Sequence, residues 1–405
     1  MKAQERTAVA VLATVFLFNL LGRGSGETYA VFLLPLQHEF GWARSQLTSV
    51  YSMYLVVGAF MAPLAGTLFD RFGPRATYST GLLCLSAAFL LASSLGNLWQ
   101  FYLFIGVTIG LGVGLVGMVP ASALLTRWYR ARLSTAIGIA FAATGTGALV
   151  FVPVAQVLID HIGWRDTYRV LAALMFLAVP VALFVVPWRT YVAGWQDSVS
   201  GQRERGATPG WTVREAVRTR MFWSLSQVFF FTATGMFAVL VQAVAYFIDL
   251  GFSPLAAAMA YGVTGMLSVV SVSSSGLAAE RFGFRNTVSA SFAGTAAGVA
   301  LLLVLSYLHS GVLLAAFVAV FGLCMGVRGP IISAIATRKF TGPKVASIYG
   351  LIFAANAVGA AFGSLMSGVL HDLTGGYRAG FLLSLASVAM AVAPFWTVKE
   401  LRNFR

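Results

Sequence analysis

The sequence predicts an all-α integral membrane protein whose twelve spans form two six-helix bundles related by a pseudo-two-fold axis. Three observations carry this prediction. Apolar residues make up 59% of the 405 residues and charged residues only 10%, against about 25% charged residues in soluble domains. Apolar runs recur along the chain, each near the roughly 20 residues that a helix needs to cross a bilayer. A polar motif also occurs twice, half a chain apart, which indicates two copies of one unit.

The repeated motif lies at residues 66–75 and again at residues 276–285. The first copy reads Gly-Thr-Leu-Phe-Asp-Arg-Phe-Gly-Pro-Arg and the second Gly-Leu-Ala-Ala-Glu-Arg-Phe-Gly-Phe-Arg. Each copy is too polar to lie in lipid and separates two apolar runs, so it predicts a tight turn at the membrane surface. Two such halves in a membrane protein usually enclose a site where they meet. The repeat therefore makes a transporter the first hypothesis.

The individual spans follow from the apolar runs. They are predicted at about 7–37, 45–69, 76–96, 98–126, 133–159, 166–188, 221–249, 254–279, 286–308, 311–337, 345–371 and 377–398. With both termini in the cytoplasm, 21 Lys and Arg are cytoplasmic and only Arg44, Arg165, Arg169 and Arg378 are outside. Because basic residues favour the cytoplasmic side, we expect a multi-pass protein of the inner (plasma) membrane with both termini cytoplasmic.

The longest hydrophilic stretch, residues 189–220, contains six arginines and is predicted to be a cytoplasmic linker. It separates an N-terminal bundle at 1–188 from a C-terminal bundle at 221–405. Residues from Trp211 to Trp223 show helical spacing, which predicts an interfacial helix at the end of the linker. Its arginines favour anionic lipid headgroups over a protein partner.

Several other functions are disfavoured. The net charge of +14 is not a nucleic-acid signal, because the basic residues lie at helix ends. Cys84 and Cys324 lie in apolar helices and are predicted to be buried thiols. The chain has no Walker-type loop, zinc spacing or nucleophile–base arrangement, so neither an enzyme nor a cofactor is expected. Four residues at the outer ends of two spans are predicted to be solvated caps rather than a metal site: Asp160, His161, His371 and Asp372.

Three ionisable residues lie deep inside predicted spans: Arg23, Glu27 and Arg328. A charge near the bilayer centre costs about 2.5–3.5 kcal/mol on insertion scales, so such residues usually face water or one another. Arg23 and Glu27 are four residues apart and can pair on one helix face. The structural alternative is a pair that only lets the first span insert. For Arg328 the structural alternative is a snorkelling or helix-locking arginine.

The two halves, the central linker and the motif Gly-x-x-x-Asp-Arg-x-Gly-x-Arg together resemble the major facilitator superfamily over the whole chain. The resemblance implies the major facilitator fold and transport by rocking of the two halves. It implies that spans 1, 4, 7 and 10 line one aqueous chamber, which would hold all three buried charges. It further implies a conformational charge relay formed by Asp70, Arg71 and Arg75 and, more weakly, by Glu280, Arg281 and Arg285.

A finer resemblance is to the monocarboxylate transporters and their oxalate–formate antiporter relatives. It rests on Trp-Tyr-Arg-Ala-Arg at 128–132, Gly-Trp-Arg at 163–165 and Glu-Phe-Gly-Trp at 39–42. The resemblance implies small organic carboxylates as substrates, often moved with protons. The chain departs from the family in span 8, where Ser268 and Val272 replace a common Asp and Arg. It also departs in span 1, where Glu27 replaces a frequent Lys.

From the charges present, we predict a secondary transporter of small organic anions, most of all monocarboxylates moved with a proton. Two arginines and one acid leave a surplus positive charge that one carboxylate would balance, and a guanidinium binds a carboxylate bidentately. Arg328 and Arg23 are the predicted substrate residues and Glu27 is the predicted proton site. Tyr54 and Asn356 are the preferred polar contacts, because single bulky polar groups among apolar residues need a reason.

Other polar residues could equally bind substrate or join helices: Tyr29, Gln227, Gln242, Tyr246, Ser268 and Ser271. The rival functions are proton-driven efflux of drug-like or amphipathic compounds, organic-anion exchange, and sensing without transport. The expected partners are a small carboxylate, protons and membrane lipids, without nucleic acid, and the protein is expected to work as a monomer.

Overall fold

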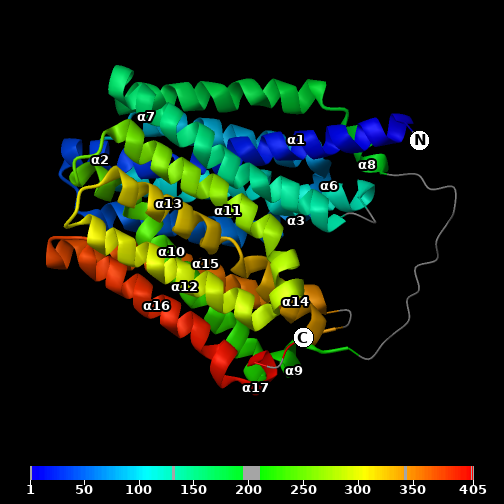
Figure 1. The fold of residues 1–405 in the computed structure, drawn as a ribbon. Coiled ribbons are helices and arrows are strands. Elements are labelled where there is room, and N and C mark those ends of the chain that lie inside the picture. The colour runs from blue at the N-terminus through cyan, green and yellow to red at the C-terminus, as the bar shows by residue number, and fades with distance from the viewer. Residues whose placement is uncertain (1, 130–132, 195–209, 342–343, 403, 405) are drawn as a thin grey trace. The chain divides into compact units, whose positions relative to one another are not determined.

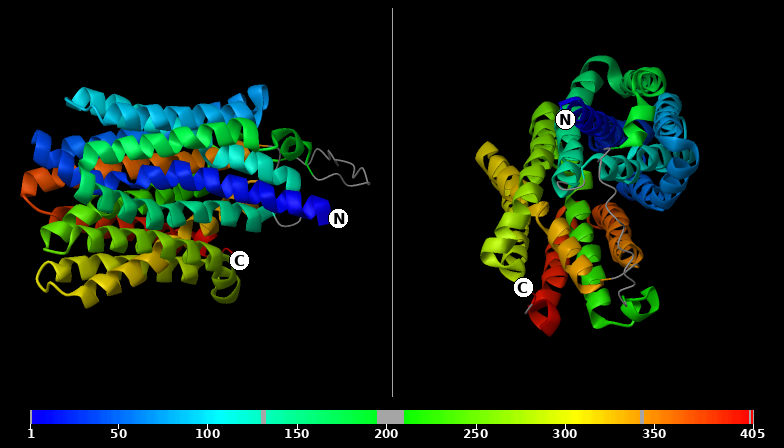
Figure 2. Two further views of the ribbon diagram at one scale, coloured as in Figure 1. Left: turned by 90° about the horizontal axis from the view of Figure 1, so that it is seen from above. Right: turned by 90° about the vertical axis from the view of Figure 1, so that its right-hand side faces the viewer.

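The computed structural model describes residues 2–129, 133–194, 210–341, 344–402 and 404. Within these ranges the chain is helical with short connections and no strand. It divides into two compact units, unit 1 (Met1–Val199 and Phe252–Met266) and unit 2 (Ser200–Gly251 and Leu267–Arg405). The long helices of each unit run side by side (Figures 1 and 2). The start of predicted span 8 belongs to unit 1, and the predicted domain boundaries at 188 and 221 stay predictions.

Unit 1 is built from long helices and two π-helical segments. In order these are α1 (Lys2–Glu27), α2 (Tyr29–Phe40), α3 (Arg44–Ala92), α4 (Leu98–Phe101), η1 (Tyr102–Ile109), α5 (Gly110–Val116), α6 (Met118–Trp128), α7 (Leu133–Pro180), η2 (Val181–Val185) and α8 (Trp188–Ala193). The start of α11 (Pro254–Phe282) also belongs to this unit.

Unit 2 contains the rest of α11 and eight further helices. These are α9 (Val213–Val217), α10 (Arg220–Asp249), α12 (Phe284–Leu305), α13 (Gly311–Met325), α14 (Arg328–Lys339), α15 (Val345–Thr374), α16 (Arg378–Thr397) and α17 (Lys399–Arg402). Their apolar faces meet in a core that includes Phe229, Phe292, Ile332 and Phe395.

The described residues contain ten helical stretches that are long and apolar enough to cross a membrane. Two of them, α3 with 49 residues and Thr135–Val185 with 51 residues, are too long for a single crossing. At 1.5 Å per residue, 49 residues rise about 74 Å, more than twice the roughly 30 Å hydrocarbon core. Each doubles back at a glycine with non-helical backbone, Gly73 (φ 79°) and Gly163 (φ 81°). The described chain therefore makes twelve crossings, and the twelve-span all-α prediction is confirmed.

The two motif copies form the same backbone turn. Gly73 ends the first limb of α3 at φ 79°, and Gly283 separates α11 from α12 at φ 80°. Only glycine adopts such positive φ values without steric cost. The residues on either side continue as helix, so the chain reverses within a few residues. The tight turns predicted from the repeat are thereby confirmed.

The predicted linker begins and ends in short helices that pack on the bundles. Trp188 of α8 is buried and stacks on Tyr78, with ring centroids 5.4 Å apart. Before α9, the Thr212 and Glu215 side chains each accept a hydrogen bond from the other's backbone N–H. The bond from the Thr212 N–H lowers the pKa of the Glu215 carboxyl. The interfacial position of this segment stays a prediction, and the predicted lipid contacts of Arg203 and Arg205 lie outside the described residues.

Glycines bring α10 and α15 of unit 2 into close contact. A Cβ atom built at Gly359 of α15 would lie 2.1 Å from the Phe230 carbonyl oxygen of α10, and one at Gly363 would lie 2.3 Å from the Thr234 carbonyl oxygen. The Thr234 hydroxyl donates to the Gly359 carbonyl over 3.1 Å. Small residues at four-residue spacing allow this backbone approach.

We expect Gly359→Ala to destabilise unit 2, because the added methyl group meets backbone that cannot rotate away. Overpacking of this kind costs about 1–3 kcal/mol. The measurement is the midpoint of thermal unfolding of the purified protein in detergent. Gly350→Ala is the matched control, since a Cβ at Gly350 on the same helix meets no atom within 4 Å. Equal midpoints for the two variants would show that this crossing is not tight.

Candidate functional site

The first span contains one tightened turn, next to two of the buried charges. Helix α1 ends at Glu27 and α2 begins at Tyr29, with Thr28 between them. The Thr28 hydroxyl donates to the Ser25 carbonyl over 2.6 Å, and the Thr28 N–H also reaches this carbonyl. Thr28 keeps right-handed helical dihedrals (φ −61°, ψ −16°), so α1 and α2 continue as one span. Glu27 stands next to this tightened turn, and Arg23 lies one turn before it.

A glycine pair fixes α1 against α7 at the same level. A Cβ atom at Gly24 would lie 2.7 Å from the Cα atom of Gly147, and one at Gly147 would lie 2.6 Å from the Cα of Gly24. Helix backbones that touch in this way leave no room for side chains between them. Arg23 and Glu27 occupy the neighbouring face of α1, so their side chains extend beside this contact rather than into it.

Three tyrosines surround the two charges, and we call Tyr51, Tyr54 and Tyr261 the phenol cluster. All three are buried, with 4%, 4% and 7% of their surface exposed. The Tyr54 hydroxyl lies directly over Gly26, where a Cβ atom would approach it to 2.6 Å. The rings of Tyr51 and Tyr54 are 5.2 Å apart. A cavity of about 10 Å³ adjoins them, lined in part by Ser25, Gly26 and Thr28, which is room for roughly one water molecule.

Glu27 is hydrogen-bonded to a residue more than half the chain away. The Tyr261 hydroxyl donates to Glu27 Oε2 over 2.6 Å, and Tyr261 lies in the part of α11 that belongs to unit 1. Among the described residues, no ion pair within 4 Å joins Glu27 to Arg23. The pairing that their spacing allows is therefore not formed. Both side chains are half-buried.

Within the described ranges, the Arg23 guanidinium has neither a hydrogen bond nor an ion pair. Its electrostatic neighbours are Tyr54, Glu27 and Tyr51. A half-buried guanidinium retains five donors in a planar fork that matches a carboxylate. The predicted role of Arg23 in binding the substrate carboxylate stays a prediction.

Arg328 lies in unit 2, at the start of α14, and only 1% of its surface is exposed. Its Nη2 donates to Thr295 Oγ1 over 2.9 Å, and its guanidinium carbon lies 4.7 Å from the centre of the Phe292 ring. Both partners belong to α12. The packing resembles the helix-locking alternative, yet Nε and Nη1 are buried without a hydrogen-bond partner in the described chain. Its predicted substrate role, and the chamber shared with Arg23 and Glu27, stay predictions.

We expect Thr295→Val to destabilise unit 2, because it removes the acceptor of a buried guanidinium that already lacks partners. An unsatisfied buried donor costs about 1–3 kcal/mol, and more when it is charged. The thermal midpoint in detergent should fall for Thr295→Val and be largely retained for Thr295→Ser, which keeps the hydroxyl. A midpoint that is the same for Val and Ser would mean that the Thr295 hydroxyl does not hold Arg328.

The other predicted polar contacts divide into two groups. Asn356 is half-buried on α15, and Tyr54 belongs to the phenol cluster, so both remain candidates. Several others join helices through hydrogen bonds of the kind that close packing provides. Tyr246 donates to Leu302 O over 2.6 Å, Gln227 to Met390 O over 3.0 Å, the Ser271 hydroxyl accepts from Gly326 N over 3.1 Å, and Tyr29 donates to Leu47 O.

The six residues of the predicted charge relay lie at the turns of the two motif copies. Their arginines contact aromatic rings: Arg71 with Phe72, Arg75 with Phe184, Arg281 with Phe282, and Arg285 with Trp396. In the described residues, Asp70 and Glu280 have no ion pair within 4 Å. The gating role of these residues stays a prediction.

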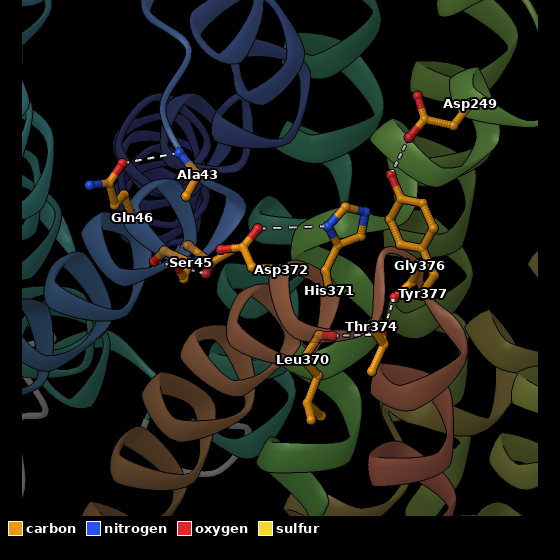
Figure 3. Close-up of polar contacts among 11 residues, drawn as sticks. Ala43, Ser45, Gln46, Asp249, Leu370, His371, Asp372, Thr374, Gly376 and Tyr377 are labelled. Carbon is orange, nitrogen blue, oxygen red and sulfur yellow. Dashed lines mark hydrogen bonds and ion pairs between the residues drawn. The ribbon is translucent and has the colours of Figure 1, made fainter.

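The last turn of α15 contains two of the residues predicted to be solvated caps, His371 and Asp372 (Figure 3). His371 Nδ1 lies 3.8 Å from Asp372 Oδ1, and the two side chains are 19% and 28% exposed. Tyr377 packs against His371 and donates to Asp249. Thr374 donates to Leu370 O over 2.7 Å and closes the helix end. His371 and Tyr377 are partly buried, whereas Asp372 and Thr374 are exposed.

Sequence reasoning missed Tyr261 and Thr295. The signal for Tyr261 was present, because it is a single bulky polar residue in the small-residue run Ala-Ala-Ala-Met-Ala-Tyr-Gly at 256–262. The same criterion selected Tyr54. The pairing of Tyr261 with Glu27 could not be predicted in this way, since no local sequence pattern links two residues so far apart in the chain.

Comparison with known proteins places this arrangement in a family. The family model described as Major Facilitator Superfamily matches residues 12–327 and 272–403. Monocarboxylate transporter 13 of Bos taurus is 26% identical over 386 residues, covering 92% of this chain and 85% of that protein. Monocarboxylate transporter 3 of Rattus norvegicus is 28% identical over 391 residues, covering 95% and 79%.

Solved structures share the fold at low sequence identity. A variant of the nucleoside transporter NupG gives a TM-score of 0.74 at 14% identity and covers 95% of this chain and 98% of that chain. A bacterial homologue of the human lysosomal transporter Spinster gives a TM-score of 0.69 at 15% identity, with 95% of each chain covered.

Proposed function

Because this chain belongs to the major facilitator superfamily and is homologous to monocarboxylate transporters over most of its length, we propose that it moves small monocarboxylates together with protons by alternating access. The observation that carries the proposal is the Arg23 guanidinium, which has no acid partner in the described chain and stands beside Glu27. Arg23 would bind the substrate carboxylate and Glu27 would carry the proton.

The charges of this site supply a physical reason for coupling. With Glu27 ionised and the site empty, Arg23 and Glu27 sum to zero formal charge. A bound monocarboxylate without a proton leaves one negative charge, and a proton without substrate leaves one positive charge. Burying an uncompensated charge costs several kcal/mol. The occluded intermediate is therefore favoured only when the protein is empty or carries both substrate and proton.

The same balance favours monocarboxylates over dicarboxylates. A second carboxylate on the substrate would add a charge that neither Arg23 nor one proton on Glu27 neutralises. Like charges within a low-dielectric site repel strongly. Tyr54 remains a proposed contact to the rest of the substrate, and the residues of the charge relay remain the proposed conformational lock. The substrate roles of Asn356 and Arg328 in unit 2 stay predictions. We further propose a plasma-membrane monomer with cytoplasmic termini.

The test is uptake of labelled formate, acetate, lactate, pyruvate, oxalate and succinate into proteoliposomes, with and without an inward proton gradient. Uptake of a monocarboxylate that the gradient stimulates supports the proposal. Carboxylate flux that ignores the gradient but needs internal anion would instead mean exchange. No carboxylate flux would favour proton-driven efflux or sensing. Arg328→Gln measured beside the wild type tests whether unit 2 contributes to the anion site.

A further inference from the structure

We propose that Tyr261 is a positioning residue: its hydroxyl holds the Glu27 carboxyl away from Arg23 and so keeps the guanidinium available for the substrate carboxylate. This inference rests on the proposed function for its consequence in transport. The contact that supports it is within unit 1 and needs no ligand to be tested.

Without a restraint, Arg23 and Glu27 would be expected to pair. Residues four apart on a helix are neighbours, with Cβ atoms about 5–6 Å apart. The attraction between their charges grows as water is removed, because the effective dielectric constant falls. Both side chains are half-buried, yet the described chain holds no ion pair between them. Another contact must therefore hold one of them.

The Tyr261 hydroxyl is that contact, at 2.6 Å from Glu27 Oε2. This length falls within the about 2.5–2.7 Å range of charge-assisted O–H···O⁻ bonds. Tyr261 is 7% exposed, so water competes little for its hydroxyl. The other ionisable groups in electrostatic range of Glu27 are Arg23 on its own helix and Tyr51 and Tyr54 on α3. On the α7 side, α1 meets Gly147 and Phe151, which carry no charge.

Both ends of this hydrogen bond are fixed to the same helix. Gly24 holds α1 on Gly147, as described above. On α11, a Cβ atom at Gly262 would lie 2.8 Å from the Cα of Leu149, and one at Gly265 would lie 3.1 Å from the Cβ of Ala148. Residues 147–149 of α7 therefore set the distance between the backbones that carry Glu27 and Tyr261. The carboxyl is held by a rigid frame rather than by a flexible loop.

Removing the Tyr261 hydroxyl should let Glu27 turn to Arg23 and compete with substrate. In Tyr261→Phe, we expect the KM for exchange of the best-transported acid of the panel to rise about tenfold, while kcat changes less than twofold. In a Glu27→Gln background, the same Tyr261→Phe change should leave KM unaltered, since glutamine offers no charge to Arg23. Tyr349→Phe is the control. It also removes a partly buried phenol hydroxyl, which is hydrogen-bonded to the Ser333 hydroxyl over 2.7 Å, but this residue lies in unit 2.

A second readout needs no substrate. Phenylglyoxal modifies unpaired arginines faster than ion-paired ones, and mass spectrometry measures its rate at Arg23. We expect Tyr261→Phe to slow modification of Arg23 severalfold and Glu27→Gln/Tyr261→Phe to restore it. Equal rates and equal KM values in the wild type and Tyr261→Phe would overturn the inference. If the wild type moves no carboxylate, but Tyr261→Phe slows the modification of Arg23 by phenylglyoxal, the proposed function is overturned and the positioning role is retained.

Discussion

Replacing Arg23 with glutamine is expected to cause the largest loss of monocarboxylate uptake, with kcat/KM at least about 30-fold below that of the wild type. Truncating one partner of a desolvated, hydrogen-bonded charge pair costs about 2–5 kcal/mol, or roughly 30-fold to several thousand-fold. Arg23→Lys keeps the charge but loses the planar fork, so its kcat/KM should lie between those of the wild type and Arg23→Gln. The measurement is initial uptake into proteoliposomes containing equal amounts of folded protein.

Arg169→Gln provides the matched control for Arg23. It removes a guanidinium from the same unit, but Arg169 is 60% exposed and pairs with Asp166 over 2.6 Å. Exposed pairs of this kind contribute about 0–1 kcal/mol, so uptake should be retained. If Arg23→Gln transports normally while Arg328→Gln does not, the anion anchor lies in unit 2 and the site proposed in unit 1 is wrong.

Neutralising Glu27 with glutamine should abolish proton-driven accumulation while leaving exchange of carboxylate for carboxylate. Glutamine cannot take up a proton, so the loaded site with Arg23 and one carboxylate is neutral and the empty site carries one positive charge. The return of the empty protein then buries an uncompensated charge and becomes slow, whereas exchange needs only the loaded form. Accumulation under an inward proton gradient and counterflow without a gradient are the two measurements.

Glu39→Gln is the control for the loss of a carboxylate. Glu39 lies at the end of α2, where it accepts hydrogen bonds from Trp164 and Arg165 and its side chain is 37% exposed. Its removal should leave the gradient response intact. A Glu27→Gln protein that still accumulates substrate with the proton gradient would place the coupled proton on another group.

The fold could be predicted because its causes are local. Each span is recognisable as a run of about 20 apolar residues. The turns at Gly73 and Gly283 are predicted by a single glycine between bulky neighbours. The long helices α3 and α7 differ from the prediction only in that their limbs remain helical up to the turn. The tightened turn at Thr28 had no such signal, since threonine neither forbids helix nor demands a turn.

The candidate site was harder to predict because its contacts are distant in sequence. Arg23 and Glu27 were recognisable as costly residues in a membrane, but their spacing suggested a pair that the structure does not contain. The reason is Tyr261, which comes from another helix, and a helix-face argument considers only one helix at a time. Arg328 shows the same limit, since its surroundings are set by Thr295 and Phe292 of α12.

The direct connection of the two limbs of α3 at Gly73 has a consequence for how the chain tolerates insertions. Helix continues up to Phe72 and resumes at Pro74, so Gly73 is the only non-helical residue between the two limbs. Because no loop separates the limbs, an inserted residue cannot be accommodated by slack chain and must shift one limb against the other. Insertions of residues beside Gly73 should therefore lower the thermal unfolding midpoint of the purified protein in detergent.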